Sequence, residues 1–101
     1  MGTQPVKIDL PPAEIARLCQ TYRIREMGLF GSVARGQASL NSDMDIFVEF
    51  EPGIHPGQRL FDLEEDLERL LGRRVDLSQK SLRKPRVRQA ALREAVILYA
   101  A

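Results

Sequence analysis

The sequence predicts an α/β (α+β) fold, in which a small mixed β-sheet is flanked by helices in the order α-β-α-β-α-β-α. Three observations support this prediction. Apolar residues recur at helical spacing in three segments, shorter runs between them are rich in β-forming residues, and turn-forming residues separate the two kinds. The chain has 101 residues, enough for one hydrophobic core, so we expect a single domain over residues 1–101.

Three helices and one short helical turn are expected. The prolines at 11–12 suit the first turn of a helix. The apolar face of this first helix comprises Ile15, Leu18, Cys19 and Tyr22. Leucines at the same spacing predict a second helix over 60–71, with Gly72 as its cap. A third helix is expected over 85–99, and residues 32–36 form a short helix at most.

Two expectations concern side chains on these helices. Cys19 belongs to the apolar face of the first helix, so we interpret it as a core residue and not as a nucleophile. In the second helix the charged residues between the leucines are expected on the solvent side, and these are Glu64, Glu65, Glu68 and Arg69.

Three strands are expected over 24–30, 43–50 and 75–78, where β-branched and aromatic residues are frequent. Residues 41–42 read as a turn, and residues 51–57 read as a loop because they contain two prolines and two glycines.

Charge and composition exclude several classes of protein. Fifteen Lys and Arg against 14 Asp and Glu give a net charge of +1, which disfavours a general polyanion binder, and no direct nucleic-acid binding is expected. One cysteine excludes an internal disulfide framework and a cysteine-rich zinc site. No apolar run approaches the ~20 residues of a membrane span, and the first residues do not resemble a signal peptide. We therefore expect a cytoplasmic protein without a membrane partner.

Two aspartates predict a metal site. Successive side chains of a strand alternate between its faces, so Asp43 and Asp45 are expected on the same face. Adjacent carboxylates repel unless a cation lies between them, and Mg²⁺ prefers oxygen ligands. Asp76, on the third strand, completes the set if that strand lies beside the first two. The alternative interpretation is that these are solvated surface carboxylates, and it weighs most for Asp76.

A phosphate site is predicted beside the acids. Gly31 ends the first strand and allows a ligand to approach the backbone closely, and Ser32 begins a helical turn with free N–H groups and a hydroxyl. Phosphate and carboxylate groups are both negative, so a phosphate site beside three carboxylates requires bound cations between them. With two bound cations this becomes a site for two-metal phosphoryl or nucleotidyl transfer.

The motifs together resemble a known family. The string LFGSVARG over 29–36 is followed by SDMDI over 42–46, with ten residues between Ser32 and Asp43. This resembles the minimal nucleotidyltransferase (MNT) subgroup of the polymerase-β-like nucleotidyltransferases. The resemblance covers about residues 24–78 and implies the polymerase-β-like fold.

The resemblance also implies roles for the site residues. Asp43 and Asp45 would be metal ligands, and Asp76 would be the third ligand and the activator of the attacking hydroxyl. Gly31 and Ser32 would bind the β and γ phosphates of the nucleotide. Arg35 neutralises phosphate charge in one interpretation and pairs with a surface acid in another.

Proteins that resemble this chain are typically the antitoxin of a HEPN–MNT toxin–antitoxin pair. This implies Mg²⁺-dependent transfer of AMP from ATP to a tyrosine of the HEPN ribonuclease toxin, within a hetero-oligomer. About twenty residues follow the last predicted strand, so the acceptor is expected to be a protein itself, or to be bound by a partner or by a second copy of the chain. Two alternatives are open: an antitoxin that masks the toxin without catalysis, and a nucleotidyltransferase acting on a small molecule.

A basic run leaves one more question open. Five cations lie within nine residues, at Lys80, Arg83, Lys84, Arg86 and Arg88. The run is either a solvated helix start or a contact with an acidic partner or with nucleotide.

Overall fold

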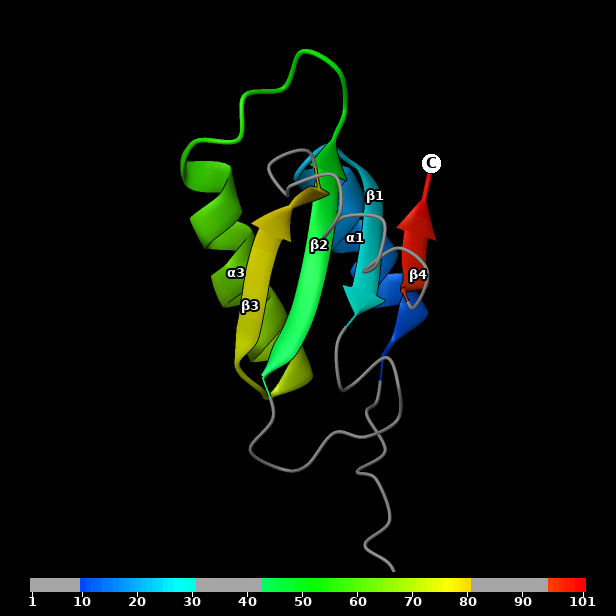
Figure 1. The fold of residues 1–101 in the computed structure, drawn as a ribbon, viewed down its shortest axis with the longest axis vertical. Coiled ribbons are helices and arrows are strands. Elements are labelled where there is room, and N and C mark those ends of the chain that lie inside the picture. The colour runs from blue at the N-terminus through cyan, green and yellow to red at the C-terminus, as the bar shows by residue number, and fades with distance from the viewer. Residues whose placement is uncertain (1–9, 31–42, 81–94) are drawn as a thin grey trace, which may run out of the picture.

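The computed structural model describes residues 10–30, 43–80 and 95–101 (Figure 1). Within these ranges the elements are α1 (Pro12–Thr21), β1 (Ile24–Phe30), β2 (Met44–Phe50), α3 (Gln58–Leu71), β3 (Val75–Gln79) and β4 (Val96–Ala100). No helix in these ranges has the length and apolar character needed to cross a membrane.

The four strands form one sheet in the order β3-β2-β1-β4. β2 and β3 are parallel, whereas β1 pairs antiparallel with both β2 and β4. The predicted mixed sheet is therefore confirmed. Both described helices lie on the same side of it, as Figure 1 shows, so the described part of the chain has two layers.

The core lies between the helices and the sheet. Ile15 and Cys19 of α1 and Leu63 and Leu67 of α3 are buried there, as the apolar spacing predicted. Strand side chains join the same cluster, and they alternate along each strand except at the irregularity of β1 between Ile24 and Glu26: Ile24, Met27, Leu29, Met44, Ile46, Val48, Val75 and Leu77. The other side of each strand faces away from both described helices.

The ends of the helices follow their sequence signals. α1 begins at Pro12 after an extended Pro11, because proline needs no N–H partner in the first turn. α3 ends at Gly72, whose φ of 66° is left-handed and whose N–H donates to the Glu68 carbonyl at 2.8 Å. The predicted glycine cap is confirmed.

The predicted final helix is wrong over its last residues. Residues 96–100 form β4, which pairs antiparallel with β1, and residues 85–94 lie outside the described residues. The run Val-Ile-Leu-Tyr over 96–99 favours a strand through its β-branched and aromatic residues. It can also complete hydrogen bonds along β1, a partner that is distant in sequence and that helical periodicity does not reveal. The predicted helical turn at 32–36 also lies outside the described residues.

Candidate active site

Two of the predicted acids are direct neighbours on the sheet. β2 and β3 run parallel with Asp45 opposite Asp76, and neighbouring strands lie about 4.8 Å apart. The residues on either side of each aspartate, Met44 and Ile46 or Val75 and Leu77, have their side chains in the core. Alternation therefore places both carboxylates on the face away from the described helices.

The register that brings these acids together is specific. Moving β3 by one residue along β2 would send the Asp76 side chain into the core and an apolar side chain outward. Because burying Val75 and Leu77 is favourable and burying a carboxylate is costly, the apolar pattern fixes the position of Asp76 beside Asp45.

Asp43 lies just before this sheet. The strand predicted to begin at 43 begins at Met44, whose N–H donates to the Arg74 carbonyl at 2.9 Å, and Asp43 is exposed. The structure thus places Asp43 at the N-terminal end of β2, two residues before Asp45.

These carboxylates suit a hard cation in their chemistry. Asp45 and Asp76 supply oxygen donors from adjacent strands, which is the donor type that Mg²⁺ prefers. In the ranges 10–30, 43–80 and 95–101, however, no three His, Cys, Asp or Glu side chains are gathered as a ready ligand group. The pair of Asp45 and Asp76 fits a divalent cation, whereas a ligand group of three that also includes Asp43 stays a prediction.

The predicted phosphate site consists of residues that follow β1 in the sequence. Gly31, Ser32 and Arg35 lie outside the described residues. β1, the strand that precedes them in the sequence, ends at Phe30, which is paired with Asp45.

An aromatic layer lies next to the acids on the same face. Phe47 is 2% exposed although it is outside the core cluster, and its ring centroid lies 6.1 Å from that of Phe30. The ring crosses Gly28 of β1, where a Cβ atom would lie 2.2 Å from the Phe47 Cζ atom. Gly28 is therefore the residue type that leaves room for the ring beside β1.

A charged layer follows the aromatic one. Glu26 of β1 and Glu49 of β2 are directly opposite each other, and Lys80 Nζ lies 2.6 Å from Glu26 Oε1 and 3.7 Å from Glu49 Oε2. Lys80 is the first cation of the basic run, and it contacts its own sheet. The other four cations of the run lie outside the described residues.

Two glutamates of α3 occupy the outer edge of β3. Glu68 Oε2 accepts a hydrogen bond from the Val75 N–H at 3.0 Å, and Glu64 Oε2 accepts one from the Leu77 N–H at 3.4 Å. Both bonds are partly buried, so the expectation that Glu64 and Glu68 lie on the solvent side is wrong. Their i, i+4 spacing beside a following strand is a signal that sequence reasoning missed.

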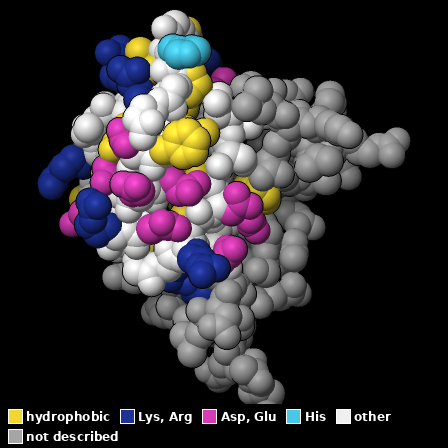
Figure 2. Space-filling model, turned by 90° about the vertical axis from the view of Figure 1, so that its left-hand side faces the viewer, with side chains coloured by type: hydrophobic (Ala, Val, Ile, Leu, Met, Phe, Trp, Pro, Cys, Tyr) yellow, Lys and Arg dark blue, Asp and Glu magenta, His cyan; other side chains and the backbone are white. Residues whose placement is uncertain are grey.

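The outer side of α3 is acidic. Asp62 and Glu65 of this helix are exposed, and Figure 2, which looks at the left-hand side of Figure 1, shows acidic side chains gathered there. Phe61, on the same helix, is 63% exposed.

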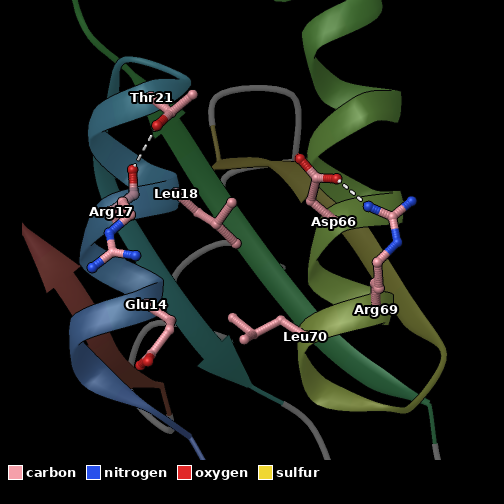
Figure 3. A pocket seen from close by; sticks show the side chains of 7 residues that line it. All are labelled: Glu14, Arg17, Leu18, Thr21, Asp66, Arg69 and Leu70. Carbon is pink, nitrogen blue, oxygen red and sulfur yellow. Dashed lines mark hydrogen bonds and ion pairs between the residues drawn. The ribbon is translucent and has the colours of Figure 1, made fainter.

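A groove between the two helices lies on the other side of the molecule from the acids. Its volume is about 440 Å³, and Leu18 of α1 and Leu70 of α3 point toward each other inside it (Figure 3). Each helix adds charges at the rim, and on α3 Arg69 donates to Asp66 at 3.1 Å. Because the sheet separates this groove from Asp45 and Asp76, the groove is distinct from the predicted nucleotide site.

Two titratable groups in the helical layer have raised pKa values. Burial raises the pKa of the Cys19 thiol to about 12, which agrees with its interpretation as an inert core residue. Burial and a hydrogen bond donated to Asp66 raise the pKa of the Tyr22 hydroxyl to about 12.

Comparisons with known proteins give consistent results. A family model described as polymerase β, nucleotidyltransferase matches residues 13–101. The protein adenylyltransferase MntA of Thermococcus cleftensis is 47% identical over 79 residues, which are 78% of this chain and 79% of that protein.

Solved structures show the same fold. A structure provisionally identified as a minimal nucleotidyltransferase is 40% identical with a TM-score of 0.71, covering 84% of this chain and 86% of that one. A structure of the tri-AMPylated Shewanella oneidensis HEPN toxin in complex with MNT antitoxin contains a chain that is 20% identical, with a TM-score of 0.64. The match covers 89% of this chain and 70% of that one, and at this identity it is a likeness of fold alone.

Proposed function

The chain belongs to the polymerase β family of nucleotidyltransferases, and on that premise we propose that it is an antitoxin that transfers AMP from ATP to a tyrosine of a HEPN ribonuclease toxin. The name of its Thermococcus cleftensis relative, protein adenylyltransferase, supports a protein acceptor. The Shewanella oneidensis complex joins an AMPylated HEPN toxin to an antitoxin of the same fold, which supports a HEPN protein as that acceptor. Because the donor is ATP, we place the reaction in the cytoplasm.

One observation of this structure carries the proposal: the direct pairing of Asp45 with Asp76 on the face opposite the described helices. Two carboxylates side by side repel each other, which is unfavourable for stability and useful for binding a cation. Mg²⁺ held by Asp43, Asp45 and Asp76 would supply the positive charge that a triphosphate needs at this surface.

Different residues of the chain would bind the phosphates and accept the proton in this reaction. Gly31 and Ser32 follow the end of β1 and would bind the β and γ phosphates, with Arg35 adding positive charge. The acceptor is a phenol with an ordinary pKa of about 10, so its proton must be removed as its oxygen attacks. Asp76 would accept that proton. The tyrosine oxygen forms a bond to the α-phosphorus, the bond from that phosphorus to the bridging oxygen breaks, and pyrophosphate leaves.

The direct test is a transfer assay. The purified chain is incubated with labelled ATP, Mg²⁺ and the HEPN protein encoded beside its gene. We expect label on one or more tyrosines of that protein, located by mass spectrometry. Label that appears only on a small molecule would favour the small-molecule alternative.

The variant Asp76→Asn distinguishes an antitoxin that modifies the toxin from one that only binds it. This variant keeps Asp43 and Asp45, so it should bind ATP and the toxin nearly as the wild type does, yet fail to add AMP. In a cell that makes the toxin, it should not protect if modification is the mechanism. Full protection with an unmodified toxin would show that the antitoxin acts by binding alone.

A further inference from the structure

The outer edge of β3 is closed by side chains instead of a strand. In the described sheet β3 is the outermost strand, and its Arg74 carbonyl accepts the Met44 N–H, so the backbone groups of even-numbered residues face β2. The N–H groups of Val75 and Leu77 therefore face outward. Glu68 and Glu64 of α3 accept them at 3.0 and 3.4 Å.

The spacing of helix and strand makes this arrangement regular. Four residues along a helix rise about 6.0 Å and two residues along a strand rise about 6.6 Å, so glutamates at i and i+4 can meet alternate N–H groups. α3 runs antiparallel to β3 after the turn at Gly72, which matches Glu68 to Val75 and Glu64 to Leu77. Four residues before Glu64 lies Leu60, whose side chain has no acceptor atom. The arrangement therefore has two hydrogen bonds, which we call the two rungs.

The two rungs lie on either side of Asp76. Glu68 accepts the N–H of Val75, which precedes Asp76, and Glu64 accepts the N–H of Leu77, which follows it. On the inner side of β3, Asp76 is paired with Asp45 of β2. Outer strands lack a second ladder of backbone bonds and fluctuate more than central ones. Without the two glutamates, the peptide groups flanking Asp76 would be held only by β2.

We propose that Glu68, assisted by Glu64, is a positioning residue that fixes Asp76 beside Asp45 and so sets the affinity of this carboxylate pair for a divalent cation. The inference rests on the proposed function, in which Asp76 is a metal ligand. Of the two bonds the one to Glu68 is shorter, so it should contribute more. The contact requires an acceptor oxygen and not a negative charge, and this distinguishes positioning from a general electrostatic effect.

The test uses the full chain and Mn²⁺ alone, without nucleotide or toxin. Mn²⁺ affinity is measured by electron paramagnetic resonance, and amide hydrogen exchange at Val75 is measured by NMR. Glu68→Ala should speed exchange at Val75 and weaken Mn²⁺ binding, each by about tenfold, as expected when one hydrogen bond is lost. Glu68→Gln keeps an acceptor oxygen and should restore most of both values.

Matched variants make the result decisive. Glu65→Ala removes the same charge from an exposed position of α3 and should change neither value. Glu64→Ala should give a smaller effect in the same direction, which protects the test if Glu68→Ala folds poorly. Asp76→Asn gives the loss of Mn²⁺ affinity that is expected when this ligand is removed completely.

Three outcomes would overturn the inference. In the first, Glu68→Ala binds Mn²⁺ as the wild type does although Asp76→Asn does not. In the second, Glu68→Gln loses as much Mn²⁺ affinity as Glu68→Ala. In the third, Asp76→Asn leaves Mn²⁺ binding unchanged. A wild-type chain that binds Mn²⁺ in this pattern but transfers no AMP would defeat the proposed function and leave the inference standing.

Discussion

Lys80 Nζ lies 2.6 Å from Glu26 Oε1, although β2 separates the strand that precedes Lys80 from the strand that carries Glu26. The ammonium group crosses above Phe47, 5.9 Å from the centre of its ring, and also lies 3.7 Å from Glu49 Oε2. Glu26 and Glu49 are direct cross-strand partners, an arrangement that is unfavourable for like charges. Lys80 compensates this repulsion and ties the end of β3 to β1.

Removing the ammonium group should therefore destabilise the sheet. Lys80→Ala leaves two opposed carboxylates without their shared cation, and both side chains are only partly exposed. We expect the free energy of unfolding to fall by about 1–3 kcal/mol, between the values for exposed and buried pairs. Urea unfolding at pH 7 measures this change. Arg25→Ala, at an exposed cation of β1, is the control, and Glu49→Gln should recover part of the loss.

Gly28 should tolerate no side chain while Phe47 is present. Gly28→Ala would place a Cβ atom 2.2 Å from the Phe47 Cζ atom, and the ring is buried and cannot swing freely. Overpacking of this kind costs about 1–3 kcal/mol. Combining Gly28→Ala with Phe47→Leu should restore part of the stability, so the double variant should lose less than the sum of the single ones. Strict additivity in thermal unfolding would contradict this packing.

Much of the framework of the site could be predicted from local patterns. The spacing of Ile15 and Cys19 gave the buried face of α1, because a helix repeats every 3.6 residues. Alternation along β2 correctly placed Asp45 and Met44 on opposite faces, because a strand repeats every two residues. Patterns of this kind depend only on neighbours along the chain.

The remainder depends on contacts between distant segments. β4 owes its strand conformation to pairing with β1, some seventy residues earlier, and its composition also fits an apolar helix face. Glu64 and Glu68 look like solvent-facing residues until β3 is placed beside them, and Lys80 looks like part of a basic run until the sheet order is known. The sequence could not predict these roles because each needs the strand order.

Stability should fall with alkaline pH because of Cys19. Its pKa is raised from 9.0 to about 12 by burial. Below pH 9 the thiol is neutral in both states and has no effect. Between pH 9 and 12 the unfolded chain loses this proton while the folded chain keeps it, so the free energy of unfolding decreases, by at most about 1.4 kcal/mol per pH unit.

The contribution of Cys19 can be isolated by comparing slopes. Urea unfolding of the wild type and of Cys19→Ala is measured between pH 8 and 10. Folding also raises the pKa of Tyr22, from 10.0 to about 12, but Tyr22 is present in both proteins, so the difference between their slopes reports Cys19. The wild type should lose stability more steeply than the variant, whatever the difference in their absolute stabilities. Equal slopes would show that the thiol does not stay protonated in the folded chain.

The last prediction concerns the two acids of the Asp43–Asp45 motif. Asp43 is exposed, and Asp45 lies on the sheet face opposite the core, so Asp43→Asn combined with Asp45→Asn should leave the fold intact. Stability should change little, or rise as repulsion with Asp76 is relieved. Neutral amides cannot replace the charge that the cation needs, so Mg²⁺-dependent ATP binding should be lost. Calorimetric titration of ATP with and without Mg²⁺ measures this, and Glu65→Gln, which removes a charge from exposed α3, should bind as the wild type does. Unchanged affinity in the double variant would mean that Asp43 and Asp45 do not hold the metal.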